Sequence, residues 1–178
     1  QEEMLNEFNK KLDLKSINNN LSILNKYGIR PALTFILCSP KAKLEYIENT
    51  AKRILDELKK KTIYAGVMTV VGPLKGSGFY EACSDFEIQN IPIPNSKMFY
   101  KRVHFIKSYD PEVLEFQYRF LYRWAHFIKD LTKKGEDHFN SQVQSEMKLE
   151  VVLKVIDEIK SERENPQQLK FSRMSYEE

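Results

Sequence analysis

Residues able to take part in chemistry follow directly after an apolar stretch in the first half of the chain. The run 32–37 ends at Cys38, Ser39 and Pro40. Ligands of α/β proteins bind where parallel strands end and loops begin, so this strand end is a candidate site. Cys38 is a candidate nucleophile there. A small buried cysteine that only packs in the core is the commoner case, and this alternative stays open.

A glycine-rich segment is the second candidate. Gly72, Gly76 and Gly78 follow another apolar run, 63–71. Glycine lets the backbone approach a ligand and turn its amide groups toward an anion, as in phosphate-binding loops. The spacing matches neither the Walker pattern nor the dinucleotide fingerprint, so an ordinary turn is an equal alternative.

Other reactive side chains show no recognisable ligand spacing. The chain has two cysteines and three histidines: Cys38, Cys83, His104, His126 and His138. None of them forms a C-x-x-C or H-x-x-x-H pair, so no zinc site is predicted. Asp85 and Glu87 follow the glycine-rich segment and could act as acid and base, although surface carboxylates are the usual case.

Aromatic and basic residues alternate in the region 110–135. Tyr118, Arg119, Tyr122 and Arg123 could stack on a flat ligand. Aromatic stripes at helical spacing usually belong to the core of a protein, because they bury large apolar areas. We therefore expect this group to be part of the core.

Composition limits the classes of partner. The formal net charge of +3, from 28 basic and 25 acidic residues, is too balanced to indicate nucleic acid or an anionic membrane. No apolar run reaches the roughly 20 residues needed to span a bilayer. Two cysteines far apart in the sequence indicate a reducing compartment, so a cytoplasmic location is expected.

The elements expected to position the first candidate residues begin with a helix that Ser16 caps and Gly28 ends. Residues 29–38 and 63–71 are predicted to be strands, and residues 43–60 the amphipathic helix between them. This order predicts two adjacent parallel strands joined by a right-handed crossover. Because apolar residues lie at both alternating sets of positions in 32–37, helices are expected to cover both faces of the sheet.

The chain changes character after Ser84. Residues 91–95 contain two prolines and are predicted to be an extended connection, and residues 97–107 one further strand. A helix is expected from Asp110-Pro111 to Gly135. A last helix is expected to begin at Asn140 or Ser141 and to end before Asn165-Pro166. Its predicted buried stripe consists of Val143, Met147, Val151, Val155, Ile156 and Ile159.

Residues 16–80 resemble the second half of a radical S-adenosylmethionine (radical SAM) domain. The resemblance rests on the helix that ends Leu-Asn-Lys-Tyr-Gly-Ile at 24–29, on the apolar strand that closes on Cys38-Ser39-Pro40, on a helix that contains Thr50, and on the segment 72–80, Gly-Pro-Leu-Lys-Gly-Ser-Gly-Phe-Tyr. The family has glycine where this chain has Cys38, an acidic residue directly after the proline, and Pro-Gly-Thr where this chain has Lys-Gly-Ser.

The resemblance implies an α/β fold. Residues 1–83 would be the C-terminal part of a partial (β/α) barrel with a parallel β-α-β unit, and residues 84–178 a largely helical extension. The full-length protein would cleave S-adenosylmethionine reductively at a [4Fe-4S] cluster. The three-cysteine cluster motif is absent here and the chain starts at Gln1, so we expect a C-terminal piece. Its partner would be the remainder of the same polypeptide or an N-terminal subunit.

The resemblance also assigns residues to the cofactor. It implies that Ile36, Leu37 and Cys38 lie near the adenine from one strand end, and that Val70, Val71, Gly72 and Pro73 lie near it from the next, mostly through the backbone. It identifies no catalytic residue and no substrate, and nothing indicates cobalamin as a second cofactor.

Two other functions stay open. One is a non-catalytic α/β interaction module, in which the long helices form a partner surface. The other is a nucleotide-binding or phosphate-binding domain that uses residues 72–78. The coding sequence upstream would discriminate a radical SAM enzyme from both alternatives, because such an enzyme requires a cysteine triplet roughly 100 to 200 residues earlier.

Overall fold

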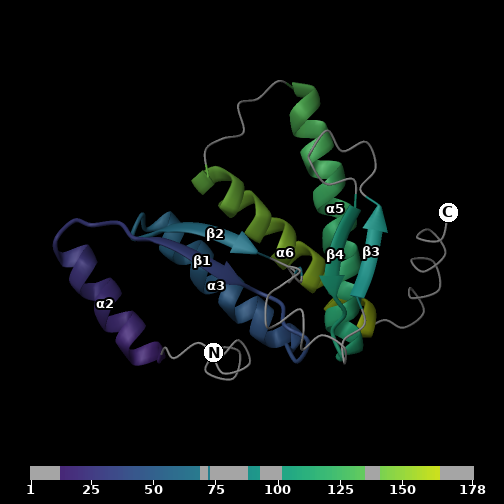
Figure 1. Ribbon diagram of the computed structural model, residues 1–178, viewed down its shortest axis with the longest axis horizontal. Coiled ribbons are helices and arrows are strands. Elements are labelled where there is room, and N and C mark those ends of the chain that lie inside the picture. Colours follow the sequence, from purple (N-terminus) through teal and green to yellow (C-terminus); the bar gives the residue numbers. More distant parts are fainter. Residues whose placement is uncertain (1–12, 69–71, 73–87, 93–101, 135–140, 165–178) are drawn as a thin grey trace.

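Helices dominate the part of the chain that the computed structural model describes (Figure 1). The described residues are 13–68, 72, 88–92, 102–134 and 141–164. In chain order the elements are α2 (Leu14–Lys26), β1 (Ala32–Ile36), α3 (Leu44–Lys59), β2 (Tyr64–Met68), β3 (Ile88–Pro92), β4 (Arg102–Ile106), α5 (Pro111–Lys134) and α6 (Ser141–Glu164).

The expected parallel pairing of the first two strands is present. β1 and β2 pair in register from Ala32 opposite Tyr64 to Ile36 opposite Met68. Helix α3 connects them, as the sequence predicts. In the described residues this sheet has only these two strands, so the partial barrel stays a prediction.

Among the described residues, helices cover one face of this sheet, whereas both faces were expected to be covered. Leu33 and Phe35 of β1 pack against the core together with the buried Val67 of β2. Ala32 and Thr34, which point to the opposite face, are exposed. The apolar character of 32–37 was misleading because, on this face, Ala32 is small, Thr34 is polar and Ile36 is partly buried without a covering helix among the described residues.

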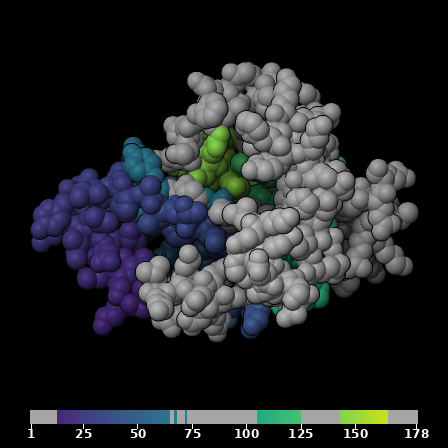
Figure 2. Space-filling view, in the orientation of Figure 1, coloured from purple at the N-terminus to yellow at the C-terminus, as the bar shows by residue number. Residues whose placement is uncertain are grey.

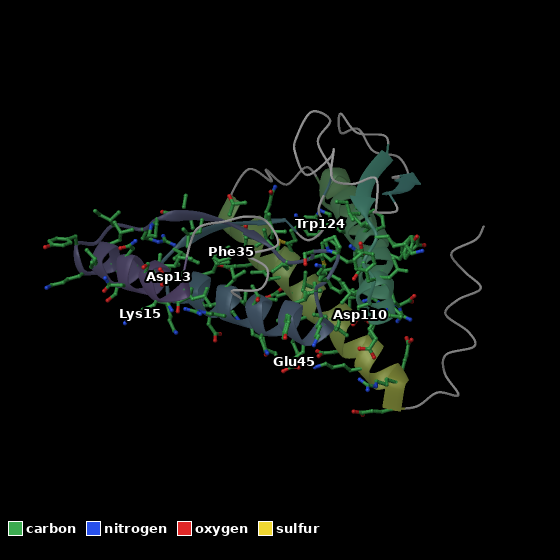
Figure 3. All side chains as sticks on the ribbon, turned by 60° about the horizontal axis from the view of Figure 1, so that its bottom comes forward. Asp13, Lys15, Phe35, Glu45, Asp110 and Trp124 are labelled. Carbon is green, nitrogen blue, oxygen red and sulfur yellow. The ribbon has the colours of Figure 1, made fainter. Side chains whose placement is uncertain are left out.

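Helices α2 and α3 lie on the same side of the strands (Figure 3). Leu21 of α2 packs against the core cluster, and the Arg53 Nη2 of α3 donates to the Asn18 Oδ1 of α2 at 2.5 Å. The two helices therefore form one layer under the sheet.

One hydrophobic core joins the two halves of the chain. It contains Leu37, Ile47, Leu58 and Val67 from the first half, together with Phe116, Phe120, Leu149, Val152 and Ile156 from the second. The proposed division at residues 83 and 84 thus separates two parts that share a core. Within the described ranges no helix is long and apolar enough to cross a membrane.

The buried stripe of α6 differs from the predicted one. Leu149, Val152, Val155, Ile156 and Ile159 are buried, whereas Val143 is 47% exposed. Met147 and Val151 are only partly buried. The prediction is thus confirmed for Val155, Ile156 and Ile159 and wrong for the first half of the helix, where Leu149 and Val152 form a second apolar set at helical spacing.

A second sheet corrects the prediction of an extended connection. β3 pairs with β4 in antiparallel register, from Ile88 opposite Ile106 to Pro92 opposite Arg102. Pro92 is the last residue of β3, where the missing N–H is tolerated. The predicted strand at 97–107 is present as β4.

Helix boundaries follow local capping rules. Asp13, not Ser16, caps α2, because the Asp13 carboxylate accepts hydrogen bonds from the Ser16 backbone and hydroxyl. Gly28 takes a φ of 70° directly after α2, which only glycine adopts without strain. Asp110 caps α5 as predicted, since its Oδ1 accepts from the Glu112 N–H at 2.8 Å.

The aromatic residues of α5 belong only partly to the core. Phe116, Phe120 and Trp124 form a stacked row with ring centroids 5.9 and 6.1 Å apart. Arg119 is buried, as expected for the core. Tyr122 is 47% exposed, so the prediction is wrong for this residue.

Candidate ligand site at the carboxyl ends of β1 and β2

The carboxyl end of β1 is closed by the segment that leads into α5. The Ser108 hydroxyl donates to the Pro40 carbonyl oxygen at 3.1 Å, and the Tyr109 N–H donates to the same oxygen at 2.9 Å. The Ser108 N–H in turn donates to the Gln117 Oε1 at 3.0 Å. Residues 37–40 are buried beneath these contacts, so their side chains do not reach solvent.

Cys38 has a packing environment. Its side chain is fully buried in the core cluster, and burial raises the pKa of its thiol well above the ordinary value. A thiolate is required for nucleophilic attack and for metal ligation. The structure therefore favours the packing role over the nucleophile that its position at a strand end suggested.

Ser39 has a more unusual environment. It is 2% exposed, and its hydroxyl has no hydrogen-bond partner among the atoms of the described chain. A buried hydroxyl without a partner costs roughly 1–3 kcal/mol relative to a satisfied one. The unsatisfied Ser39 hydroxyl lies at the end of β1, where the sequence predicts a ligand site.

The residues assigned to the cofactor divide into two groups. Ile36 shares the open face of the sheet with Thr34, whereas Leu37 and Cys38 are buried. Gly72 is exposed. Val70, Val71 and Pro73 lie outside the described residues, as do most of the glycine-rich segment, Cys83, Asp85 and Glu87. The assignment of these residues to an adenine site stays a prediction.

A lysine that sequence reasoning missed lies at the end of β2. The Lys148 Nζ of α6 donates to the Val67 carbonyl oxygen at 2.7 Å and lies 5.3 Å from the centroid of the Trp124 ring. Burial lowers the pKa of this ammonium group. Residue 148 is four residues before the buried Val152 and seven before the buried Val155, so helical spacing places it on the buried face of α6. This spacing is the sequence signal that could have identified Lys148.

A separate cavity of about 280 Å³ lies between the start of α5 and the end of α6. Arg119, which is 4% exposed, donates there to the Glu162 carboxylate through both Nη atoms, at 2.7 and 2.6 Å, and to the Glu115 Oε1 at 2.7 Å. Its charge is thus balanced by the protein. We interpret this group as an ion-pair cluster that joins the two helices.

Histidines contribute little to the described sites. The side chains of His104 and His126 and the whole of His138 lie outside the description. Among the residues that are described, no three histidine, cysteine or acidic side chains come together in a way that could hold a metal ion.

No family model, no curated protein and no solved structure compared with this chain matches it.

Proposed function

We propose that this chain is the C-terminal part of a radical SAM enzyme, and that the open face of the β1–β2 pair lines the pocket for S-adenosylmethionine and substrate. The observation that carries the proposal is a parallel β-α-β unit whose described helices lie on one face, while Ala32 and Thr34 on the other face are exposed. In a (β/α) barrel the helices surround the outside and the strands enclose the interior. A doubly wound sheet would be covered on both faces.

The free edge of β1 supports a partial barrel. In the described residues β1 pairs only with β2, and α2 lies beside α3 before the chain enters β1. A helix in this place is the usual crossover from a preceding parallel strand. We propose that the remainder of the same polypeptide supplies that strand. It would also cover Tyr27 and Ile29, which are 73% and 52% exposed just before β1.

The residues present fit one side of a cofactor pocket. Thr34 and Ile36 project from the open face, and Gly72 offers backbone without a side chain near the end of β2. Leu37 and Cys38 support this surface from the core. A [4Fe-4S] cluster does not fit this chain, because Cys38 is buried and one further cysteine cannot complete a set of three. We place the cluster ligands in the rest of the protein.

The test uses the full-length protein, purified without oxygen and reconstituted with iron and sulfide. We expect its coding sequence to contain a cysteine triplet upstream of Gln1. With a one-electron reductant, the protein should release methionine from S-adenosylmethionine, and the same sample without reductant is the control. A protein that has no triplet and leaves S-adenosylmethionine intact would contradict the proposal and favour the interaction module.

A further inference from the structure

Lys148 is a partly buried cation with no acidic partner in the part of the chain that the structure describes. Its Nζ contacts the Val67 carbonyl oxygen and faces the Trp124 ring. Within the described part of the chain no carboxylate forms an ion pair with it. A carbonyl and an aromatic face offer partial negative charge, but neither neutralises an ammonium group.

Among the described side chains of α5 and α6, the other buried or partly buried cations are paired. Arg119 has Glu115 and Glu162, and Arg123 has Glu158. Buried charges in proteins are ordinarily paired or bound to a ligand, because removing a charge from water is costly. Lys148 therefore differs from its neighbours in lacking the counter-charge that its burial calls for.

The location of Lys148 is suited to a ligand. Val67 is the residue before the last of β2, so the ammonium group lies at the carboxyl end of the parallel sheet. Loops at this end of a parallel sheet form the ligand sites of α/β proteins. Figure 2 shows part of the beginning of α6, in light green, at the molecular surface.

We propose that Lys148 binds an anionic group of a ligand, a carboxylate or a phosphate, at the carboxyl end of β2. The ammonium group acts as a compact point charge with three donors. One donor is used by the Val67 carbonyl, which fixes the direction of the side chain, and the others are directed to the anion. The inference rests on the surroundings of Lys148 and does not require S-adenosylmethionine to be the ligand.

A purely structural role is the competing explanation. The bond from Lys148 to Val67 satisfies a strand carbonyl, and this alone could account for the lysine. The two roles differ in their response to anions. Phosphate strengthens apolar burial in any protein, so both roles allow a general salt effect that the parent and a lysine variant share. A binding lysine adds a further gain that is lost with the lysine, whereas a structural lysine adds none.

The experiment compares the 178-residue chain with Lys148→Met and with Lys154→Met, an exposed position on the same helix. Thermal unfolding is recorded in sodium phosphate, sodium acetate and sodium chloride at equal ionic strength and pH. We expect the gain in Tm from chloride to phosphate or acetate to be roughly 2–4 °C larger in the parent and in Lys154→Met than in Lys148→Met. A gain in phosphate alone indicates a phosphate ligand, and a gain in acetate a carboxylate.

A second measurement needs no variant at position 148. In protein carrying carbon-13 in its lysines, the Lys148 Cε resonance should move on addition of the effective anion, and the Lys154 resonance should not. An unchanged Lys148 resonance, or an anion-induced gain in Tm that is as large in Lys148→Met as in the parent, would overturn the proposal. Because neither arm contains S-adenosylmethionine, such a result leaves the proposed cofactor assignment to its own test.

Discussion

Ser108 and Pro40 are 68 residues apart in the sequence, and the hydroxyl of Ser108 donates to the carbonyl oxygen of Pro40 across a buried contact of 3.1 Å. This bond holds the entry to α5 over the carboxyl end of β1. It links the parallel β-α-β unit to the helical part of the chain.

We expect Ser108→Ala to lower the free energy of unfolding by about 1–2 kcal/mol, because it removes the bond to Pro40 and the one that the hydroxyl accepts from the Asp110 N–H, while the Tyr109 N–H still satisfies Pro40. Urea denaturation followed by circular dichroism measures the change. Ser22→Ala, at an exposed position of α2, is the matched control and should change the value by no more than about 0.5 kcal/mol. An equal loss of unfolding free energy in both variants would show that the Ser108 hydroxyl contributes nothing to stability.

The sequence predicted those features that depend on local patterns. The parallel pair, α3, the Asp110 cap and the glycine after α2 all follow from residues close together in the chain. The open face of the sheet could not be predicted in this way, because exposure of Ala32 and Thr34 depends on which helices pack where.

The candidate site was predictable to a smaller extent. Position at a strand end suggested Cys38, but the contact between Ser108 and Pro40 closes that end and depends on a residue far away in the sequence. Lys148 was overlooked because a lysine in an amphipathic helix is normally assigned to the solvent face. Its burial results from α6 packing against β2.

The thiol of Cys38 should be inert in the folded protein. Burial raises its pKa and excludes reagents, so iodoacetamide at pH 8 should leave Cys38 unmodified over the time needed to alkylate a free thiol peptide. Peptide mass spectrometry measures the modification, and the protein in 6 M guanidinium is the control. Rapid alkylation of Cys38 in the folded protein would restore it as a candidate nucleophile.

Glu162 should contribute stability that is lost in acid. The hydrogen bonds from Arg119 lower the pKa of the Glu162 carboxyl group. A lowered folded-state pKa gives stability that is fully present above the unfolded value, near 4.5, and disappears as pH falls through the folded value.

Glu162→Gln should therefore be less stable than the parent at pH 7 by roughly 1–3 kcal/mol, and the difference should shrink below pH 4.5. Urea titrations at several pH values measure it. Glu164→Gln, at the exposed end of α6, should show no such convergence. A difference that stays constant with pH would contradict the assigned ion pair.

Lys148 should make stability rise in alkaline solution. Its folded-state pKa is lowered by burial, so the unfolded chain binds more protons between that pKa and the ordinary value of 10.5. Stability contributed by this group therefore increases as pH rises through this interval. The unfolding free energy of the parent minus that of Lys148→Met should therefore increase as pH rises, because methionine does not titrate. A pH-independent difference would show that the ammonium group is not desolvated.

The open face of β1 and β2 is the part of the structure on which the proposed function depends most. Thr34 lies in the middle of that face, opposite Gly66 of β2. Thr34→Trp should fill the proposed pocket with a bulky side chain without disturbing the core, because Thr34 is exposed. Thr34→Ser keeps the space, and Asn19→Trp adds the same bulk on exposed α2, so both serve as controls.

The most direct measurement is calorimetric titration of S-adenosylmethionine into the reconstituted full-length protein and these three variants. We predict that the parent and both controls bind it alike, and that Thr34→Trp binds at least about tenfold more weakly, which corresponds to about 1.4 kcal/mol, with an unchanged cluster absorbance. A parent that does not bind S-adenosylmethionine, or a Thr34→Trp variant that binds it as tightly as the parent, would contradict the proposed pocket.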